Sequence, residues 1–285
     1  MPSSSDDAIE IRLSGVFTVV HDGAAIAGVG LGSRKARSLL KLLAVERAHL
    51  VPVGRIVAIL WRDDPPVRSA ENVATLVSRL RREVGSAVIV GGREGYRLGG
   101  PPAVRVDLDV AAHWTAESER CLAGGEPGLA MAAAERARNA LAADAALEDE
   151  SDADWAEPAR AELVALTSRI RHALAGSALA LGTPGEAVSA AQAAVAADPY
   201  DETACRFLIR AYHALGEPGR ALAVYGALRD LLATELGADP AQETQSLYLA
   251  VLREEAAPTS RLAGAGVDRA AESLGLVGRR DELRR

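Results

Sequence analysis

The sequence predicts a mainly α-helical protein with a small β part, in which a small mixed domain precedes a longer domain of paired helices. Three observations support this fold class. A short helix with one apolar face is followed at once by a glycine-rich hairpin. The chain beyond Asp107 keeps a helical pattern almost to Glu255, and one turn motif recurs three times within that part. The 285 residues suffice for two domains of ordinary size.

Composition narrows the class of protein. Aromatic residues make up only 4% of the chain, so its cores are expected to be built from Ala, Leu and Val, which favours closely packed helices. Cys121, Cys205 and five scattered histidines have neither disulfide nor metal-ligand spacing. No catalytic motif, export signal or membrane-length apolar run is present. We therefore expect a cytoplasmic protein, not an enzyme, with no metal, no cofactor and no membrane contact.

Positive charge is concentrated in one segment. Leu31–Arg97 contains 13 Lys and Arg against 6 Asp and Glu, a net charge of +7. Because the whole chain carries −7, everything outside this segment sums to −14. A basic island in an acidic protein indicates that the segment meets a polyanion.

The first elements are predicted to be strands. Residues 1–8 form a polar tail that we expect to be disordered. Ile9–Leu13 alternates apolar and polar residues, as a half-buried strand does. Val16–Val20 followed by the turn His21–Gly23 predicts an antiparallel meander.

Three helices are predicted next. Ser33 is placed to cap a helix over about residues 34–47. Pro52 opens a second helix that ends near Trp61, and the prolines of Arg62–Pro66 predict a loop. Ser69 is then expected to cap the third helix.

The third helix, clearest over Asn72–Val84, has two distinct faces. On a helical wheel its apolar residues form one stripe: Val73, Leu76, Val77, Leu80 and Val84. The opposite face carries Glu71, Thr75, Ser78 and Arg82, with Arg79 at its edge. Directly after it, Ala87–Leu98 predicts a β-hairpin with a glycine-rich tip that presents Arg93.

These residue types suit contact with DNA. Arg, Ser and Thr read base edges and hold phosphates in a major groove, and Asn72 lies near the helix start, where recognition helices touch bases. An arginine on a short hairpin can enter a minor groove. The helix alone would also fit an ordinary solvated surface helix; the adjoining hairpin and the local charge favour DNA. Four further cations are candidate phosphate contacts: Lys35, Arg37, Arg55 and Arg68.

The second half contains an internal repeat. The composition of the chain changes at Gly99–Pro102, a run of two glycines and two prolines that predicts a domain boundary. Beyond it, the motif G-x-P-G-x-A occurs at Gly125–Ala130, Gly182–Ala187 and Gly216–Ala221. The last two copies are 34 residues apart, the period of tetratricopeptide helix pairs. The glycines and proline would end one helix and start its partner, with the small Ala where the two cross.

Several motifs together resemble one known family, the Streptomyces antibiotic regulatory proteins. The matching stretches are Arg34–Leu40, Leu60–Trp61 with Asp64–Pro66, Asn72 with Val77–Arg82, Gly95–Leu98, Ala221–Tyr225, Glu235–Gly237 and Asp239–Pro240. The resemblance implies an OmpR-type winged helix-turn-helix domain over residues 9–100. A tetratricopeptide-like bacterial transcriptional activation domain would follow over 105–255. Residues 256–285 would then be a linker and the start of a truncated ATPase-like domain.

The same resemblance implies a function and partners. Members activate transcription by binding direct repeats of double-stranded DNA near a promoter as head-to-tail pairs, a homodimer on DNA, and recruit RNA polymerase holoenzyme through its sigma subunit. By this resemblance the chain would be a nucleoid-associated regulator of secondary metabolism, such as antibiotic biosynthesis. Asp63 and Asp64, in the loop before the third helix, would contact the polymerase.

One alternative stays open at this stage. The helical repeats could bind a protein partner while the first domain reads no DNA sequence, which would make the chain an interaction adaptor. The basic face of the third helix distinguishes the two hypotheses.

Overall fold

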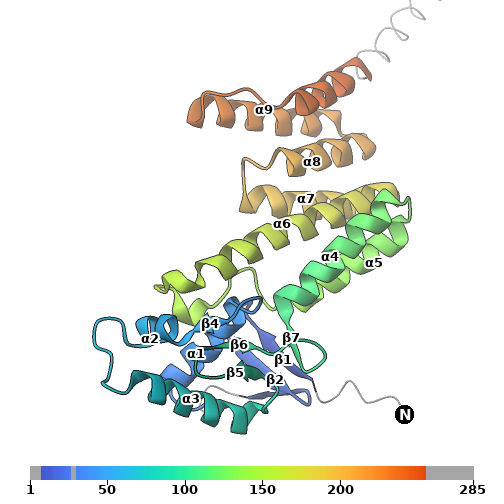
Figure 1. The fold of residues 1–285 in the computed structure, drawn as a ribbon. Helices are drawn as coiled ribbons and strands as arrows, with labels where there is room; N and C mark the ends of the chain where they lie inside the picture. Colours follow the sequence, from blue (N-terminus) through green and yellow to red (C-terminus); the bar gives the residue numbers. More distant parts are fainter. Residues whose placement is uncertain (1–7, 27–29, 255–285) are drawn as a thin grey trace, which may run out of the picture. The chain divides into compact units, whose positions relative to one another are not determined.

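The computed structural model describes residues 8–26 and 30–254 (Figure 1). They fall into two compact units that join between Leu181 and Gly182. The fold class is as predicted: mainly helical, with a winged helix followed by paired helices. Apart from Ala8, the expected disordered tail lies outside the described residues, as do the expected linker and ATPase-like segment. Among the described helices, none combines the length and the apolarity that a membrane crossing requires.

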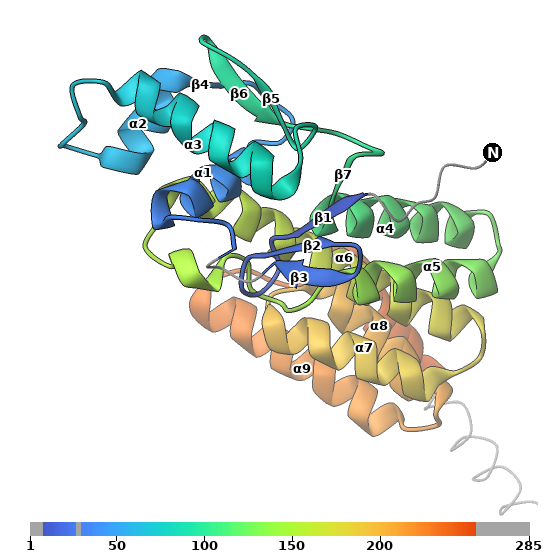
Figure 2. The same ribbon diagram turned by 90° about the horizontal axis from the view of Figure 1, so that it is seen from below.

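A four-stranded sheet opens the first unit, in the order β3-β2-β1-β7. Its strands are β1 (Ile9–Arg12), β2 (Thr18–His21), β3 (Ala24–Ile26) and β7 (Val104–Val106). The first three form the predicted antiparallel meander, with Ile11 opposite Val19 and a tight turn at Gly23 (Figure 2).

Three helices and a second sheet complete the winged helix. The helices are α1 (Arg34–Val45), α2 (Val53–Trp61) and α3 (Ser69–Val84). The hairpin of β5 (Ile89–Gly91) and β6 (Gly95–Leu98) adds β4 (Val51–Pro52) along its edge. Helix α1 packs on α2 and α3, because one side of it carries a row of fully buried leucines: Leu39, Leu40, Leu42 and Leu43.

The helix starts follow the prediction in two cases of three. The Ser33 side chain accepts a hydrogen bond from the Ala36 amide at 3.3 Å and caps α1. Helix α2 begins directly after Pro52, which has no side-chain donor or acceptor to cap it. The predicted Ser69 cap of α3 is wrong. Ser69 is already the first helical residue and Arg68 occupies the cap position, so the Ser69 hydroxyl does not close the helix end.

The Gly99–Pro102 break does not end the first sheet. After it the chain returns as β7, which pairs in parallel with β1 and sets Val106 opposite Ile11. Val104 and Val106 are both buried there. Burial of these two valines explains why the sheet extends beyond a glycine- and proline-rich segment that reads as a boundary in the sequence.

Helices make up most of the remaining described chain in both units. In the first unit α4 (Asp107–Ala123), α5 (Pro127–Ala140) and α6 (Glu157–Ala180) pack against one another. The connection between α5 and α6 contains two short 3-10 helices, η2 (Glu148–Glu150) and η3 (Asp154–Ala156). In the second unit, α8 (Glu202–Ala214) packs on α7 (Pro184–Ala197) and on α9 (Pro218–Glu235), and residues 242–254 are helical.

The repeated turn motif forms as expected. In each copy the first glycine has a positive φ of 73° to 77°, a conformation that glycine adopts without strain. The proline follows in the first turn of α5, α7 or α9, where its missing N–H costs nothing. The alanines that close the motif are fully buried: Ala130, Ala187 and Ala221.

A buried carboxylate joins the winged helix to the helices of the first unit. Asp107, only 1% exposed, lies where β7 leads into α4. Its carboxylate accepts from the backbone amides of Leu13 and Ser14 and from that of Leu108, each at 2.9 Å, and from the Ser14 hydroxyl at 2.5 Å. The Ser14 oxygen in turn accepts from the Ala142 amide at 2.8 Å, after α5.

Replacing Asp107 with alanine should therefore destabilise the first unit. The amides of Leu13 and Ser14 would stay buried without an acceptor, at a cost of about 3 kcal/mol. Chemical denaturation followed by circular dichroism measures the change. The exposed Asp152 offers a matched control, and an Asp107→Ala protein as stable as Asp152→Ala would contradict the role given to this carboxylate.

The second unit contains a cysteine that reports its unfolding. Cys205 lies buried between α8 and α9 against Leu228 and Leu232. Burial away from water raises the pKa of its thiol to about 11. The native thiol should therefore resist alkylation at pH 8 and react only when the unit opens. Iodoacetamide labelling followed by mass spectrometry would show rapid native-state modification of Cys205 if this packing were wrong.

Candidate nucleic-acid interface

The outer face of α3 is exposed along its length. The apolar stripe is buried as predicted, and the opposite face carries Asn72, Thr75, Ser78, Arg79 and Arg82, all exposed. Burial of Val73, Leu80 and Val84 fixes the rotation of the helix about its axis. The sequence prediction of which side chains point outward is therefore confirmed.

The exposed arginines of α3 are not held by the helices of the first unit. Among the described residues Arg82 pairs only with its neighbour Glu83, at 3.6 Å, and both side chains are largely in solvent. No hydrogen bond or ion pair within the described residues holds Arg79. The Thr75 hydroxyl donates to the Glu71 carbonyl at 2.9 Å, which is a local contact. Both guanidinium groups are thus available to an external anion.

The hairpin that follows α3 forms the predicted wing. Val90 lies opposite Arg97, and the Gly92 amide donates to the Gly95 carbonyl at 2.9 Å, which closes the tip that carries Arg93. Gly91 has a φ of +122°, and a Cβ there would lie 2.3 Å from the Gly95 carbonyl oxygen. The tip therefore requires glycine at this position, and it leaves Arg93 exposed.

Arg81 ties the wing to α3, a role that the sequence analysis missed. Its Nε donates to the Ile89 carbonyl at 2.8 Å and its Nη2 to the Gly91 carbonyl at 3.2 Å. The guanidinium also lies 5.9 Å from the centre of the Tyr96 ring. The position of Arg81 next to buried Leu80 was the available signal, because a residue beside the apolar stripe can reach the neighbouring element.

The candidate phosphate contacts have different surroundings. Arg55 forms an ion pair with Glu46, and Arg68 lies 3.7 Å from Glu71 with both side chains mostly exposed. Exposed pairs of this kind are weak and can exchange for another anion. Arg37 donates to the Gly32 carbonyl at 2.8 Å. The Lys35 ammonium lies 4.3 Å from the centre of the Trp61 ring.

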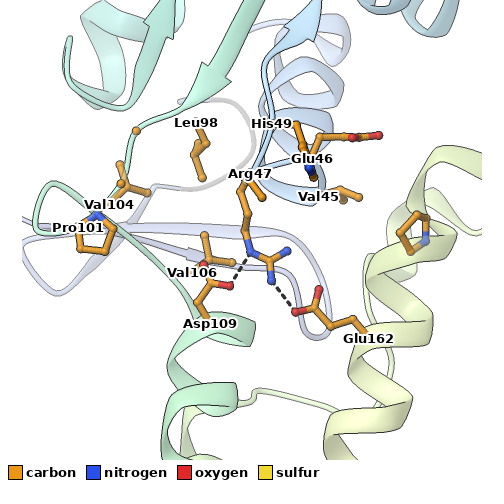
Figure 3. A pocket seen from close by; sticks show the side chains of 14 residues that line it. Val45, Glu46, Arg47, His49, Leu98, Pro101, Val104, Val106, Asp109 and Glu162 are labelled. Atoms are coloured by element: carbon orange, nitrogen blue, oxygen red, sulfur yellow. Dashed lines mark hydrogen bonds and ion pairs between the residues drawn. The ribbon is translucent and has the colours of Figure 1, made fainter.

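Two cations of the basic segment instead form ion pairs with carboxylates inside the protein. Lys41, 3% exposed, pairs with Asp149 at 2.5 Å and with Glu150 at 2.9 Å. Arg47 bonds Asp109 at 2.7 Å and Glu162 at 2.6 Å, beside a cavity of about 480 Å3 (Figure 3). The net charge of +7 therefore overstates what an external polyanion meets.

The pKa of Arg47 follows from these contacts. Burial pulls this pKa down, but the hydrogen bonds to Glu162 and Asp109 outweigh burial, and the net effect is to raise it. Through these two carboxylates the Arg47 guanidinium connects the end of α1 to α4 and α6.

Asp63 and Asp64 lie together in the loop between α2 and α3. Both are exposed, and the Asp64 amide donates to the Trp61 carbonyl at 3.1 Å. No ion pair engages either carboxylate within the part of the chain that the structure describes. The loop therefore presents two free negative charges next to the basic surface.

Comparison with known proteins identifies the helical part of the chain. The family model of the bacterial transcriptional activator domain matches residues 106–252. The chain is 29% identical over 242 residues to regulatory protein AfsR of Streptomyces griseus, covering 84% of this chain and 24% of AfsR. It is 26% identical over 264 residues to regulatory protein DnrI of Streptomyces peucetius, covering 87% of this chain and 93% of DnrI.

A solved structure is similar as well. Mycobacterium tuberculosis EmbR, in complex with a low affinity phosphopeptide, matches with a TM-score of 0.75 and 25% identity. The match covers 93% of this chain and 71% of that one. It confirms the succession of a winged helix and paired helices.

The contacts of Arg81 predict how the wing responds to substitution. Arg81→Lys removes the two-pronged donor, and a lysine cannot reach both the Ile89 and Gly91 carbonyls. We expect local opening of the hairpin to become easier by about 1 kcal/mol. Hydrogen exchange at the β5 and β6 amides measures this change. Arg82→Lys is the matched control, and equal exchange in the two variants would contradict the assignment.

Proposed function

The chain belongs to the bacterial transcriptional activator domain family, and from this we propose that it is a sequence-specific DNA-binding activator of transcription. One observation carries the proposal. In the part of the chain that the structure describes, no acidic helix pairs with the exposed Arg79 and Arg82 of α3, although the remainder of the chain is strongly acidic. The regulators to which the chain is similar support the same class.

In this proposal α3 lies in the major groove. Thr75, Ser78, Arg79 and Arg82 face base edges and the adjacent phosphates, and Asn72 approaches a base from the amino end of the helix. Arginine can bond a guanine through two donors at once, so Arg79 and Arg82 are the strongest candidates for sequence reading.

The wing and two further arginines would fix the protein on the duplex. Arg93 enters the minor groove from the hairpin tip, while Arg81 holds the hairpin at its angle to α3. Arg55 and Arg68 supply phosphate contacts in exchange for their weak surface partners. Lys35 and Arg37 are left out of this interface, because Lys35 lines a cavity that no residue of α3 or the wing lines, and Arg37 donates to the Gly32 carbonyl at its own helix start.

Activation would require partners beyond DNA. We propose that two copies bind direct repeats head to tail near a promoter and recruit RNA polymerase holoenzyme through its sigma subunit. Asp63 and Asp64 would contact a basic surface of the polymerase, since both carboxylates are exposed. The regulated genes would belong to secondary metabolism, including antibiotic biosynthesis.

Substitution on α3 tests the reading of bases. Once a binding site has been selected from random duplexes, Arg82→Ala should weaken binding by about 1–3 kcal/mol and change the preferred sequence at one position. Arg138→Ala removes an exposed arginine from α5 and serves as the control. Unchanged affinity and preference in Arg82→Ala and Arg79→Ala alike would favour the adaptor hypothesis.

A second measurement tests phosphate contacts. Arg68→Ala should weaken binding to all sequences alike and flatten the dependence of log affinity on log salt by about 0.9. Fluorescence anisotropy at four salt concentrations gives this slope. A slope identical to that of the unsubstituted protein would remove Arg68 from the interface.

A further inference from the structure

A second cavity in the first unit has a composition unlike that of the DNA-facing surface. It measures about 370 Å3 and lies among the start of α1, the end of α2 and η3. Its lining includes three cations and two tryptophans: Arg34, Lys35, Arg62, Trp61 and Trp155. No residue of α3 or of the wing lines it.

Positive charge predominates in the lining of this cavity. Its one carboxylate, Glu150, accepts from buried Lys41 at 2.9 Å and from the Ser38 hydroxyl at 3.3 Å. No ion pair engages Arg34 or Arg62 within the described residues. Asp63 and Asp64 follow Arg62 in the chain but do not line the cavity. An anion that entered would therefore meet free guanidinium groups.

The aromatic residues add a second requirement. The Lys35 ammonium lies over the Trp61 ring at 4.3 Å from its centre, so that indole already holds a positive charge against its face. Trp155, from η3, is a second lining residue. Indole rings beside cations suit a ligand that combines a planar ring with a negative group.

The backbone conformation of Arg62 also indicates a binding role for this cavity. Arg62 has φ 49° and ψ −114°, a combination that glycine adopts readily and a side chain with Cβ does not. An arginine that occupies a strained position, with its side chain on a cavity wall, indicates a role for that side chain.

We propose that this cavity binds a small anionic molecule that carries a planar aromatic ring. Arg34 and Arg62 bind the anionic group, Trp61 and Trp155 contact the ring, and Lys35 serves this ligand rather than DNA phosphates. The volume falls near the lower end of the range of about 300–1,000 Å3 that small-molecule sites occupy. The site is separate from the proposed DNA interface.

Calorimetric titration of the full chain at constant ionic strength tests the class of ligand. The probes are phenyl phosphate and adenosine monophosphate, which carry both an anionic group and an aromatic ring. Inorganic phosphate supplies the anionic group alone, and benzyl alcohol the ring alone. The aromatic phosphates should bind at least about tenfold more tightly than either half. No saturable binding at millimolar concentration, or inorganic phosphate binding equally well, overturns the proposal.

Substitution of Arg62 separates binding from folding. Arg62→Gly relieves the strained backbone, so this variant should melt no lower than the unsubstituted protein and yet bind phenyl phosphate about tenfold more weakly. Arg62→Lys should retain part of the affinity, and Arg253→Ala, an exposed arginine elsewhere, all of it. Equal binding by Arg62→Gly and Arg253→Ala contradicts the proposal.

Competition with DNA distinguishes the cavity from the interface. Saturating phenyl phosphate should leave the salt dependence of duplex binding unchanged. Lys35→Ala should weaken the binding of phenyl phosphate and leave the binding of the duplex as it is. If duplex and phenyl phosphate exclude each other, or if Lys35→Ala flattens the salt dependence, these cations bind DNA phosphates and the separate site does not exist. A failure of DNA binding by itself leaves the calorimetric result standing, so the two proposals fail independently.

Discussion

The carboxylate of Asp107 is the interaction on which the first unit depends. A buried charge is costly unless hydrogen bonds compensate it, and here the amides of Leu13, Ser14 and Leu108 and the Ser14 hydroxyl all donate to it. Three separate parts of the chain meet through this group: the strand end at Leu13, the start of α4, and the segment after α5 that bonds Ser14. The Leu147 amide, which donates to the Leu13 carbonyl at 2.9 Å, extends the same junction. The winged helix and the first helices therefore form one unit.

Ion pairs at α1 strengthen this junction. They also divide the cations of the basic segment into those paired inside the protein and those left exposed. Lys41 and Arg47 lie in α1 or directly after it and point toward carboxylates of the helical part, so they contribute to cohesion. Arg79 and Arg82 lie on the outer face of α3, and both side chains are exposed to solvent. The acidic helices thus neutralise the cations that face them and leave the arginines on the outer face of α3 exposed. This arrangement accounts for a basic surface on a chain of net charge −7.

Two local features show how backbone conformation and residue type are matched in the winged helix. Gly91 permits the sharp wing tip because no Cβ fits there, and Arg81 then holds the wing by two carbonyls. Arg62 is the reverse case, because a residue with a side chain occupies a backbone conformation suited to glycine. At Gly91 the backbone conformation requires glycine, whereas at Arg62 an arginine is present in spite of the backbone conformation. The wing and the cavity beside α2 are consequently distinct surfaces of the same small domain.

The sequence by itself determined the succession of meander, three helices and hairpin, the inward stripe of α3 and the three repeated turns. Those features depend on residues within a few positions of one another: Ser33 and Ala36, the spacing of Val73 and Leu80, the glycine and proline of each turn. The cap expected at Ser69 failed by one position, because helix starts are also set by packing. Only the tertiary structure decided that β7 rejoins β1, that Asp107 is buried, and that Lys41 meets Asp149, 108 residues further along the chain. Such contacts follow from the three-dimensional path of the backbone, which local periodicity does not encode.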